Sequence, residues 1–179
     1  MMKRVILSLL TIVFLSSITG CQSVKNTPQE PEVSPVVNDE INDDEFNRST
    51  AAVTITKEEF NADKKEILKI IAELDRVMKN YNFEEWLTYI DPNSITYWTN
   101  PYNLRNATKR LPNKAIKLNN LNDYFMYVFV PSRKDRKVDE IRYIALDSVK
   151  AVQMKDETDI VYYNFVKING KWMVKLPNL

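Results

Sequence analysis

Aromatic side chains are concentrated in one part of this chain. Seventeen of the nineteen aromatic residues lie after residue 55. Aromatic side chains bury large apolar areas and dominate protein cores, so residues 56–179 are predicted to form the folded part. A segment of about 120 residues has the commonest size of a domain and can enclose one continuous core. We therefore predict a single globular domain over residues 56–179.

Residues 21–55 have a different composition. Positions 22–55 contain three prolines, seven acidic residues, two basic residues and one aromatic residue, Phe46. A segment with few apolar residues and many like charges does not bury enough surface to fold. Prolines and repulsion between neighbouring carboxylates extend such a segment. Residues 21–55 are therefore predicted to be a disordered tether.

The first twenty residues have the layout of a secretory signal peptide. Lys3 and Arg4 precede an apolar run over residues 5–15, and small and polar residues follow. The run is too short for a membrane-spanning helix, which needs about 20 apolar residues. Residues 1–20 are therefore predicted to direct export and then to be removed.

The end of this segment, Ile18-Thr19-Gly20-Cys21, resembles the lipobox of bacterial lipoproteins, although Ile18 stands where that family usually has leucine. The resemblance implies that Cys21 becomes the lipid-carrying first residue of the mature chain. Cys21 is also the single cysteine, so it has no disulfide partner within the chain. The alternative is a secreted protein with an unpaired thiol. We expect a lipid-anchored protein of the cell membrane or outer membrane, facing the periplasm or the cell surface.

The folded part is predicted to begin with helices. Thr56 and Glu59 form a capping box, and apolar residues then recur at three- and four-residue steps. Asn82 and Glu85 repeat the capping signal before a shorter helix that is predicted to end at Asp91. These two helices present an apolar stripe.

The middle of the domain is less regular. Residues 94–121 are interrupted by two prolines and are predicted to contain short helical turns joined by loops. Residues 122–130 suit either a helix face or a buried strand, with the helix favoured and Pro131 as its end.

The last third is predicted to be antiparallel sheet. Its strands are expected at residues 140–146, 149–154, 159–168 and 171–176. Asn169-Gly170 predicts a two-residue hairpin, because both residues tolerate positive φ. The resulting register places six apolar residues on one face: Val161, Tyr163, Phe165, Trp172, Val174 and Leu176. That face is expected to bury itself against the helices, which gives an α+β fold with N-terminal helices packed on a curved antiparallel sheet.

This order of elements resembles the cone fold of the nuclear-transport-factor-2-like proteins. The resemblance rests on the segments 82–86, Asn-Phe-Glu-Glu-Trp, and 90–92, Ile-Asp-Pro, and on the closing Asn-Gly-Lys-Trp at residues 169–172. Steroid isomerases, polyketide cyclases and many small bacterial lipoproteins of unknown function share this fold. It implies a cavity between sheet and helices. Five aromatic residues are candidates to line that cavity: Trp86, Trp98, Tyr143, Tyr163 and Trp172. Ordinary core packing is the alternative for each of them.

Several kinds of chemistry are excluded by the composition. The chain has no histidine, which removes serine–histidine, cysteine–histidine and histidine–metal sites. Gly170 is the only glycine after residue 55, so no phosphate-binding glycine loop is present there. We expect no metal, no cofactor and no nucleic-acid partner. The resembled isomerases use a carboxyl base with tyrosine, but Asp139, Asp147 and Asp159 are more simply interpreted as turn residues at strand ends.

The sequence therefore predicts a lipid-anchored envelope protein whose domain is a non-catalytic binding or interaction module. Its partners are expected to be the membrane, through Cys21, and a protein partner or second copy on the sheet face. The first alternative is a cone that binds a small apolar ligand and has isomerase- or cyclase-like chemistry. The second is a structural surface lipoprotein. Two basic clusters, at residues 105–110 and 133–137, are interpreted as solvated surface.

Overall fold

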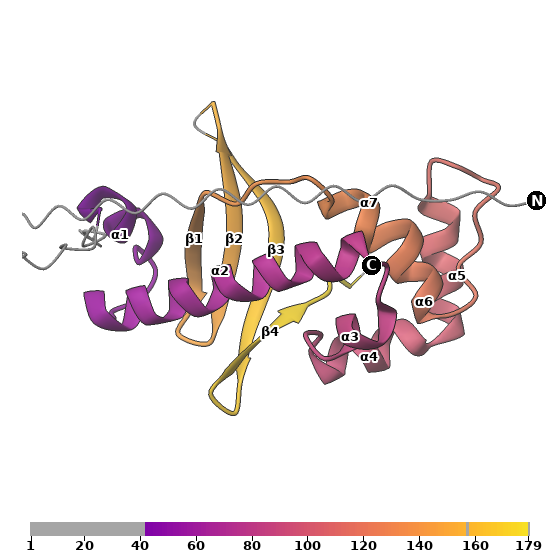
Figure 1. Cartoon of the computed structure of the whole chain (residues 1–179), viewed down its shortest axis with the longest axis horizontal. Helices are drawn as coiled ribbons and strands as arrows, with labels where there is room; N and C mark the ends of the chain where they lie inside the picture. The colour runs from indigo at the N-terminus through magenta and orange to yellow at the C-terminus, as the bar shows by residue number, and fades with distance from the viewer. Residues whose placement is uncertain (1–41, 157, 179) are drawn as a thin grey trace, which may run out of the picture. The chain divides into compact units, whose positions relative to one another are not determined.

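The structure is a computed structural model that describes residues 42–156 and 158–178. In these residues helices precede a four-stranded antiparallel sheet, and the long helix α2 (Lys57–Lys79) crosses one face of that sheet (Figure 1). This arrangement confirms the predicted α+β class. The predicted signal peptide, Cys21 and the tether up to residue 41 lie outside the described residues.

Both predicted helix starts are confirmed. Thr56 caps α2 through a reciprocal capping box with Glu59, and Asn82 caps α3 (Phe83–Leu87) by accepting the Glu85 N–H. The face of α2 that meets the sheet is the predicted apolar stripe, with fully buried Phe60, Ile67, Leu74, Val77 and Met78. Capping and a continuous apolar stripe together explain why these residues form one long helix.

The irregular middle consists of two short helices, α4 (Pro92–Thr99) and α5 (Pro101–Arg110). Each proline stands at the first position of its helix, where a missing N–H costs nothing. Asp91 and Asn100 provide the caps. The helix predicted to end at Asp91 ends at Leu87 instead, and Asp91-Pro92 starts the next helix.

Residues 121–133 form a continuous helical stretch: α6 (Leu121–Tyr124), a π-helical turn η1 (Phe125–Phe129) and α7 (Val130–Arg133). This confirms the helix favoured by the sequence, but Pro131 does not end it. The Val130 N–H donates to the Phe125 carbonyl, five residues back. A π-turn of this kind shifts the hydrogen-bond pattern where proline can neither donate nor fit the regular ladder, so the helix continues to Arg133.

The sheet is a meander in the order β1 (Glu140–Ala145), β2 (Ser148–Lys155), β3 (Thr158–Ile168) and β4 (Lys171–Lys175). These bounds lie within one residue of the predicted strands. Asn169 and Gly170 both have positive φ, at 50° and 78°. The predicted pairs are also present, with Ile168 opposite Lys171, Lys167 opposite Trp172 and Phe165 opposite Val174.

One residue of the predicted core face is misplaced. Val161 is 42% exposed, whereas the other five residues of that face are buried. The pairing of β2 with β3 shifts by one residue, because Ala151 pairs with Tyr163 while Val152 pairs with Val161. This bulge leaves Tyr162 unpaired and turns Val161 to the opposite face, since a one-residue shift reverses the side of every later residue.

The predicted tether is wrong at its C-terminal end, where residues 43–49 form helix α1 (Asp43–Ser49). Asn42 caps this helix, and three acidic residues occupy its first turn, where the helix dipole favours negative charge. Phe46 packs edge-on against Phe60, with ring centroids 5.5 Å apart. Arg48 pairs with Glu140 of β1 at 2.7 Å. The acidic residues thus start a helix, and one aromatic contact with three ion pairs attaches it to the domain, since Asp43 and Glu45 also pair with Lys57 and Lys64 of α2.

Candidate functional site

A carboxylate lies between α2 and the sheet. Asp63 is on α2, one turn after Phe60 on the stripe that faces the sheet. Its side chain is 13% exposed. Three side chains of three different strands donate hydrogen bonds to it: Tyr143 of β1, Lys167 of β3 and Trp172 of β4. We call these four residues the Asp63 cluster.

The geometry of the cluster uses both carboxylate oxygens. Tyr143 Oη donates to Oδ2 at 2.7 Å. Lys167 Nζ and Trp172 Nε1 donate to Oδ1 at 2.7 and 2.9 Å. These are short, charge-assisted hydrogen bonds, which are stronger than those between neutral groups. The cluster therefore ties helix α2 to the first, third and fourth strands of the sheet.

The hydrogen bonds also determine the acidity of the cluster. Burial acts to raise the pKa of Asp63, but the hydrogen bonds from Lys167, Trp172 and Tyr143 outweigh it, so the pKa lies below its ordinary value. Burial and the bond to Asp63 raise the pKa of Tyr143. Asp63 therefore stays ionised at neutral pH, and Tyr143 keeps its proton.

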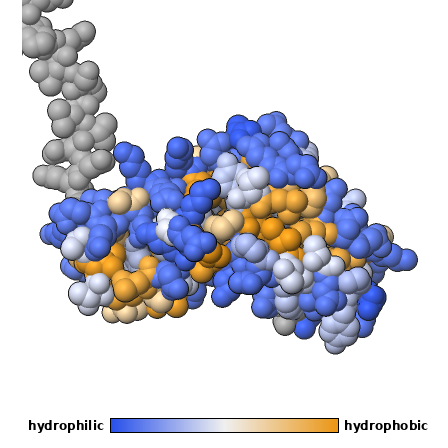
Figure 2. Space-filling model, turned by 90° about the horizontal axis from the view of Figure 1, so that it is seen from below, coloured by the Kyte–Doolittle hydropathy of each residue, from blue (hydrophilic) through white to orange (hydrophobic). Residues whose placement is uncertain are grey.

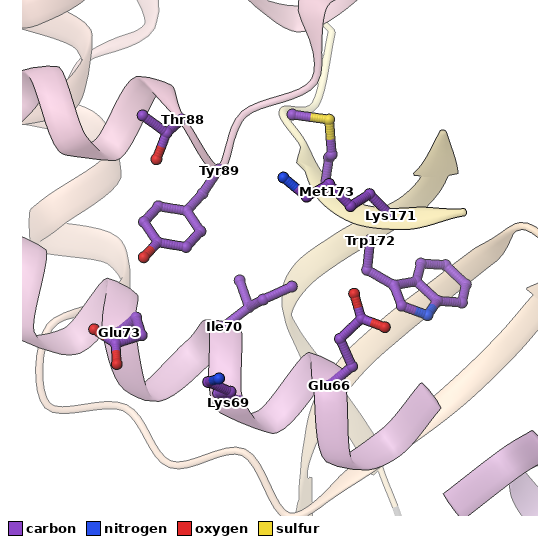
Figure 3. A pocket seen from close by; sticks show the side chains of 9 residues that line it. All are labelled: Glu66, Lys69, Ile70, Glu73, Thr88, Tyr89, Lys171, Trp172 and Met173. Carbon is purple, nitrogen blue, oxygen red and sulfur yellow. The ribbon is translucent and has the colours of Figure 1, made fainter. Parts of the chain in front are cut away.

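A pocket of about 380 Å³ opens beside this cluster, between α2, the α3–α4 connection and β4. Ile70 lies at its centre, with Tyr89 on one side and Trp172 on the other (Figure 3). Thr88 and Met173 complete its uncharged wall. Four charged side chains also line it: Glu66, Lys69, Glu73 and Lys171. We call it the α2–β4 pocket.

The five aromatic residues predicted to line a cavity occupy different places. Trp172 lines the α2–β4 pocket. Tyr143 belongs to the Asp63 cluster. The remaining three lie in the core, where each contacts other aromatic rings: Trp86 with Phe125 and Phe129, Trp98 with Tyr124, and Tyr163 with Phe129 and Phe165. The structure thus brings Tyr143 and Trp172 together through Asp63 and places the other three in the aromatic core.

The three aspartates that lie near the strand ends do not form hydrogen bonds with the neighbouring tyrosines in the contacts described below. Asp159 pairs with Arg142 at 3.1 Å. Asp139 accepts the Met154 N–H at 3.2 Å. The Asp147 carbonyl accepts the Lys167 N–H at 2.8 Å. These contacts are one ion pair and two hydrogen bonds from backbone N–H groups, and none of them involves a tyrosine.

The basic segment 133–137 is not uniformly solvated. Arg133 is 9% exposed, and its guanidinium lies over Phe129 and Tyr163, 4.2 and 5.4 Å from the ring centroids. Its Nε donates to the Tyr162 carbonyl at 2.9 Å. Burial lowers the pKa of Arg133, but arginine stays protonated in proteins. Arg133 is therefore part of the core, whereas residues 134–137 are exposed.

Asp63 is the residue that sequence reasoning missed. It follows Phe60 by three residues and precedes Ile67 by four, so it lies on the apolar stripe of the predicted helix. An acidic residue on such a stripe must find partners in the fold, because an unpaired buried charge is costly. The position of Asp63 on the apolar stripe was therefore the sequence feature that could have identified it. Its three partners are distant in sequence and could not be identified without the sheet register.

No protein-family model matches this chain, and no solved structure matches it. The chain is 29% identical over 120 residues to a protein of Treponema pallidum (strain Nichols) named "Uncharacterized lipoprotein". The alignment covers 67% of this chain and 64% of the treponemal protein, so the matched region is less than two thirds of that protein's length. No helix in the described ranges is long and apolar enough to cross a membrane. The similarity supports the interpretation of this chain as a bacterial lipoprotein.

Proposed function

We propose that a lipid on Cys21 holds this protein on a bacterial membrane and that its α+β domain works in the cell envelope. Two observations support the proposal. The segment before Cys21 has the lipobox pattern, and the chain is similar to a treponemal lipoprotein. An acylated cysteine with two or three chains holds a protein on a bilayer without a membrane-spanning helix.

Replacing Cys21 by serine is expected to release the protein from membranes, because the acceptor of the lipid is lost. The measurement is incorporation of labelled palmitate, followed by separation of membrane and soluble fractions. The wild-type chain should carry the label in the membrane fraction, and the Cys21→Ser chain should be unlabelled. Ser23→Ala, two residues beyond the cysteine, serves as the control and should behave as wild type. An unlabelled wild-type chain would refute the anchor.

For the fold, we propose a cone of the nuclear-transport-factor-2-like type. Its support is the arrangement of a long helix across a four-stranded meander, with short helices before the sheet (Figure 1). The Asp63 cluster joins this helix to three of the strands. In a cone of this kind, the space beside the long helix is the expected place for a ligand.

We propose further that the domain binds a small ligand in the α2–β4 pocket and does not transform it. The observation that carries this proposal is the pocket itself, because about 380 Å³ lies within the usual range of roughly 300–1,000 Å³ for ligand sites. Its apolar centre and charged border suit a ligand with an apolar body and a charged end. Figure 2 shows hydrophobic surface in separate areas of the face seen from below, each bordered by hydrophilic side chains.

The state of Asp63 favours binding over isomerase-like chemistry. A general base works best when its pKa lies near the operating pH, and enzymes raise carboxyl pKa values by burial to achieve this. The pKa of Asp63 is shifted in the opposite direction. Both of its oxygens already accept hydrogen bonds. Asp63 is therefore a weak base that supports the pocket wall through Trp172.

The dye 8-anilinonaphthalene-1-sulfonate tests the pocket, because it combines an apolar body with one anionic group and fluoresces in apolar sites. We expect about one bound dye for each chain, and Ile70→Trp should weaken binding by about tenfold or more by filling the centre of the pocket. The control is Ile144→Trp, since Ile144 is 51% exposed and does not line the pocket. Equal dye affinity in wild-type and Ile70→Trp chains would contradict the proposed site.

A further inference from the structure

Residues 92–122 carry basic charge without any acidic residue. The five basic residues of this segment are Arg105, Lys109, Arg110, Lys114 and Lys117. The chain as a whole has 25 basic and 24 acidic residues, so the rest of the chain carries 20 basic and 24 acidic residues and is net acidic. A local charge of +5 therefore marks α5 and the loop after it.

These five basic side chains are exposed and have no acidic partner in the ranges that the structure describes. Among the described residues none of the five forms an ion pair with a carboxylate, and all five are exposed. By contrast, Arg48, Arg76 and Arg142 are paired with acidic residues. The charge of α5 is therefore not neutralised within the described part of the chain and is free to act on a partner.

The charges lie on one side of α5. Leu104 and Ala107 are buried and fix the inner face of the helix. With 100° between successive residues, Tyr102, Arg105 and Lys109 fall on the opposite face. Tyr102 is 63% exposed. Lys114 Nζ donates to the Lys109 carbonyl at 2.9 Å, which places a further ammonium group at the end of the same helix. We call Tyr102, Arg105, Lys109, Arg110 and Lys114 the α5 basic face.

From this surface we propose that the α5 basic face docks on the anionic lipid headgroups of the membrane that carries the protein. Clustered lysine and arginine side chains near an anionic leaflet are attracted to it, by roughly fivefold in affinity for each residue. Tyrosine is a side chain that favours the membrane–water interface. The partner is thus recognised by charge and by one amphipathic ring.

The lipid anchor makes this contact geometrically accessible, and in this respect the inference rests on the proposed function. Twenty-one residue steps separate Cys21 from Asn42. A chain of that length reaches at most about 70 Å. A domain of this size has a radius of gyration of only about 14 Å, so any of its faces can meet the bilayer. Docking would orient the domain relative to the membrane surface.

The test uses the mature chain with Cys21→Ser, so that lipid insertion does not contribute to binding. Co-sedimentation is measured with phosphatidylcholine vesicles and with vesicles that also contain phosphatidylglycerol. We expect binding only to the second kind and its loss at high salt, since exposed charges are screened within about 8–10 Å. The triple variant Arg105→Glu, Lys109→Glu, Arg110→Glu should bind roughly 100-fold more weakly.

A matched triple variant controls for net charge. Lys65, Lys150 and Lys155 lie outside α5, and their replacement by glutamate changes the net charge equally, so it should weaken binding by less than about fivefold. Equal binding of the α5 variant and wild type would overturn the inference, and so would binding to both kinds of vesicle. Binding of soluble heparin through the same residues, without vesicle binding, would also overturn it and identify a polyanion site. Palmitate labelling reports separately on the anchor.

Discussion

Replacing Trp172 by alanine is expected to lower the free energy of unfolding by about 3–5 kcal/mol, the usual cost of removing a large aromatic residue from a core. Trp172 is 3% exposed. Its ring meets Tyr143 edge-on, with centroids 6.5 Å apart, and Lys167 Nζ lies 5.1 Å from its centroid. Its Nε1 donates to Asp63. The substitution thus removes core volume and one hydrogen bond together, and urea denaturation followed by circular dichroism measures the loss.

One further variant separates the contributions of core volume and hydrogen bond, and a second serves as a control. Trp172→Phe keeps an aromatic ring but removes the N–H, and we expect a loss of about 1–2 kcal/mol. Tyr102→Ala removes an exposed aromatic residue and should change stability by less than about 0.5 kcal/mol. If Trp172→Ala cost less than about 1 kcal/mol, Trp172 could not face the core, and the β3–β4 register would be wrong by one residue.

The hairpin that holds Trp172 illustrates what local sequence can predict. Asn169-Gly170 defines the turn, and the turn sets the pairing of the residues on either side. The capping box at Thr56 and the cap at Asn82 are equally local, because each involves residues three positions apart. Such features depend on short-range geometry, so the α+β class and most element bounds follow from the sequence.

Features that depend on distant contacts could not be predicted. No residue pattern indicates the bulge in β3 opposite Ala151 and Val152. This bulge turns Val161 away from the core face. The seven residues of α1 are few and highly charged, and their helix is held by contacts with α2 and β1 rather than by propensity alone. The prediction of a tether was based on composition, which contains no information about individual tertiary contacts.

The candidate site was only partly predictable for the same reason. Tyr143 and Trp172 were expected to line a cavity from their strand periodicity and from the resemblance to a cone. They meet at Asp63, which lies 80 and 109 residues away in sequence. The aromatic positions follow from local pattern, whereas the carboxylate that joins them depends on how α2 lies across the sheet.

Replacing Asp63 by alanine is expected to destabilise the domain by about 3 kcal/mol, because it leaves one ammonium group and two further donors without their acceptor in a mostly buried place. The Lys167 side chain is 32% exposed and can regain some contact with water. Trp172 Nε1 and Tyr143 Oη have less access, since both residues are 3% exposed. Thermal and urea denaturation at neutral pH measure the loss.

The charge of Asp63 gives this prediction a pH dependence. The folded-state pKa lies below the ordinary value of 3.8, so the unfolded chain binds the proton more readily than the folded chain. The stabilisation is therefore fully present above about pH 4 and is lost as the pH falls through the folded-state pKa. Glu85 and Glu140 also have lowered pKa values, so acid unfolding of the wild type alone would not isolate Asp63.

Asp63→Asn is the matched variant, because it keeps one oxygen acceptor and nearly the same shape while it removes the titrating charge. We expect wild type to be more stable than Asp63→Asn by about 1–3 kcal/mol at neutral pH. That difference should stay constant down to about pH 4 and shrink at lower pH, because only the wild type loses a charge at this position. A difference that persisted unchanged to the acid limit would mean that the ionised carboxylate does not hold α2 on the sheet, and the cluster would then act through shape and hydrogen bonding alone.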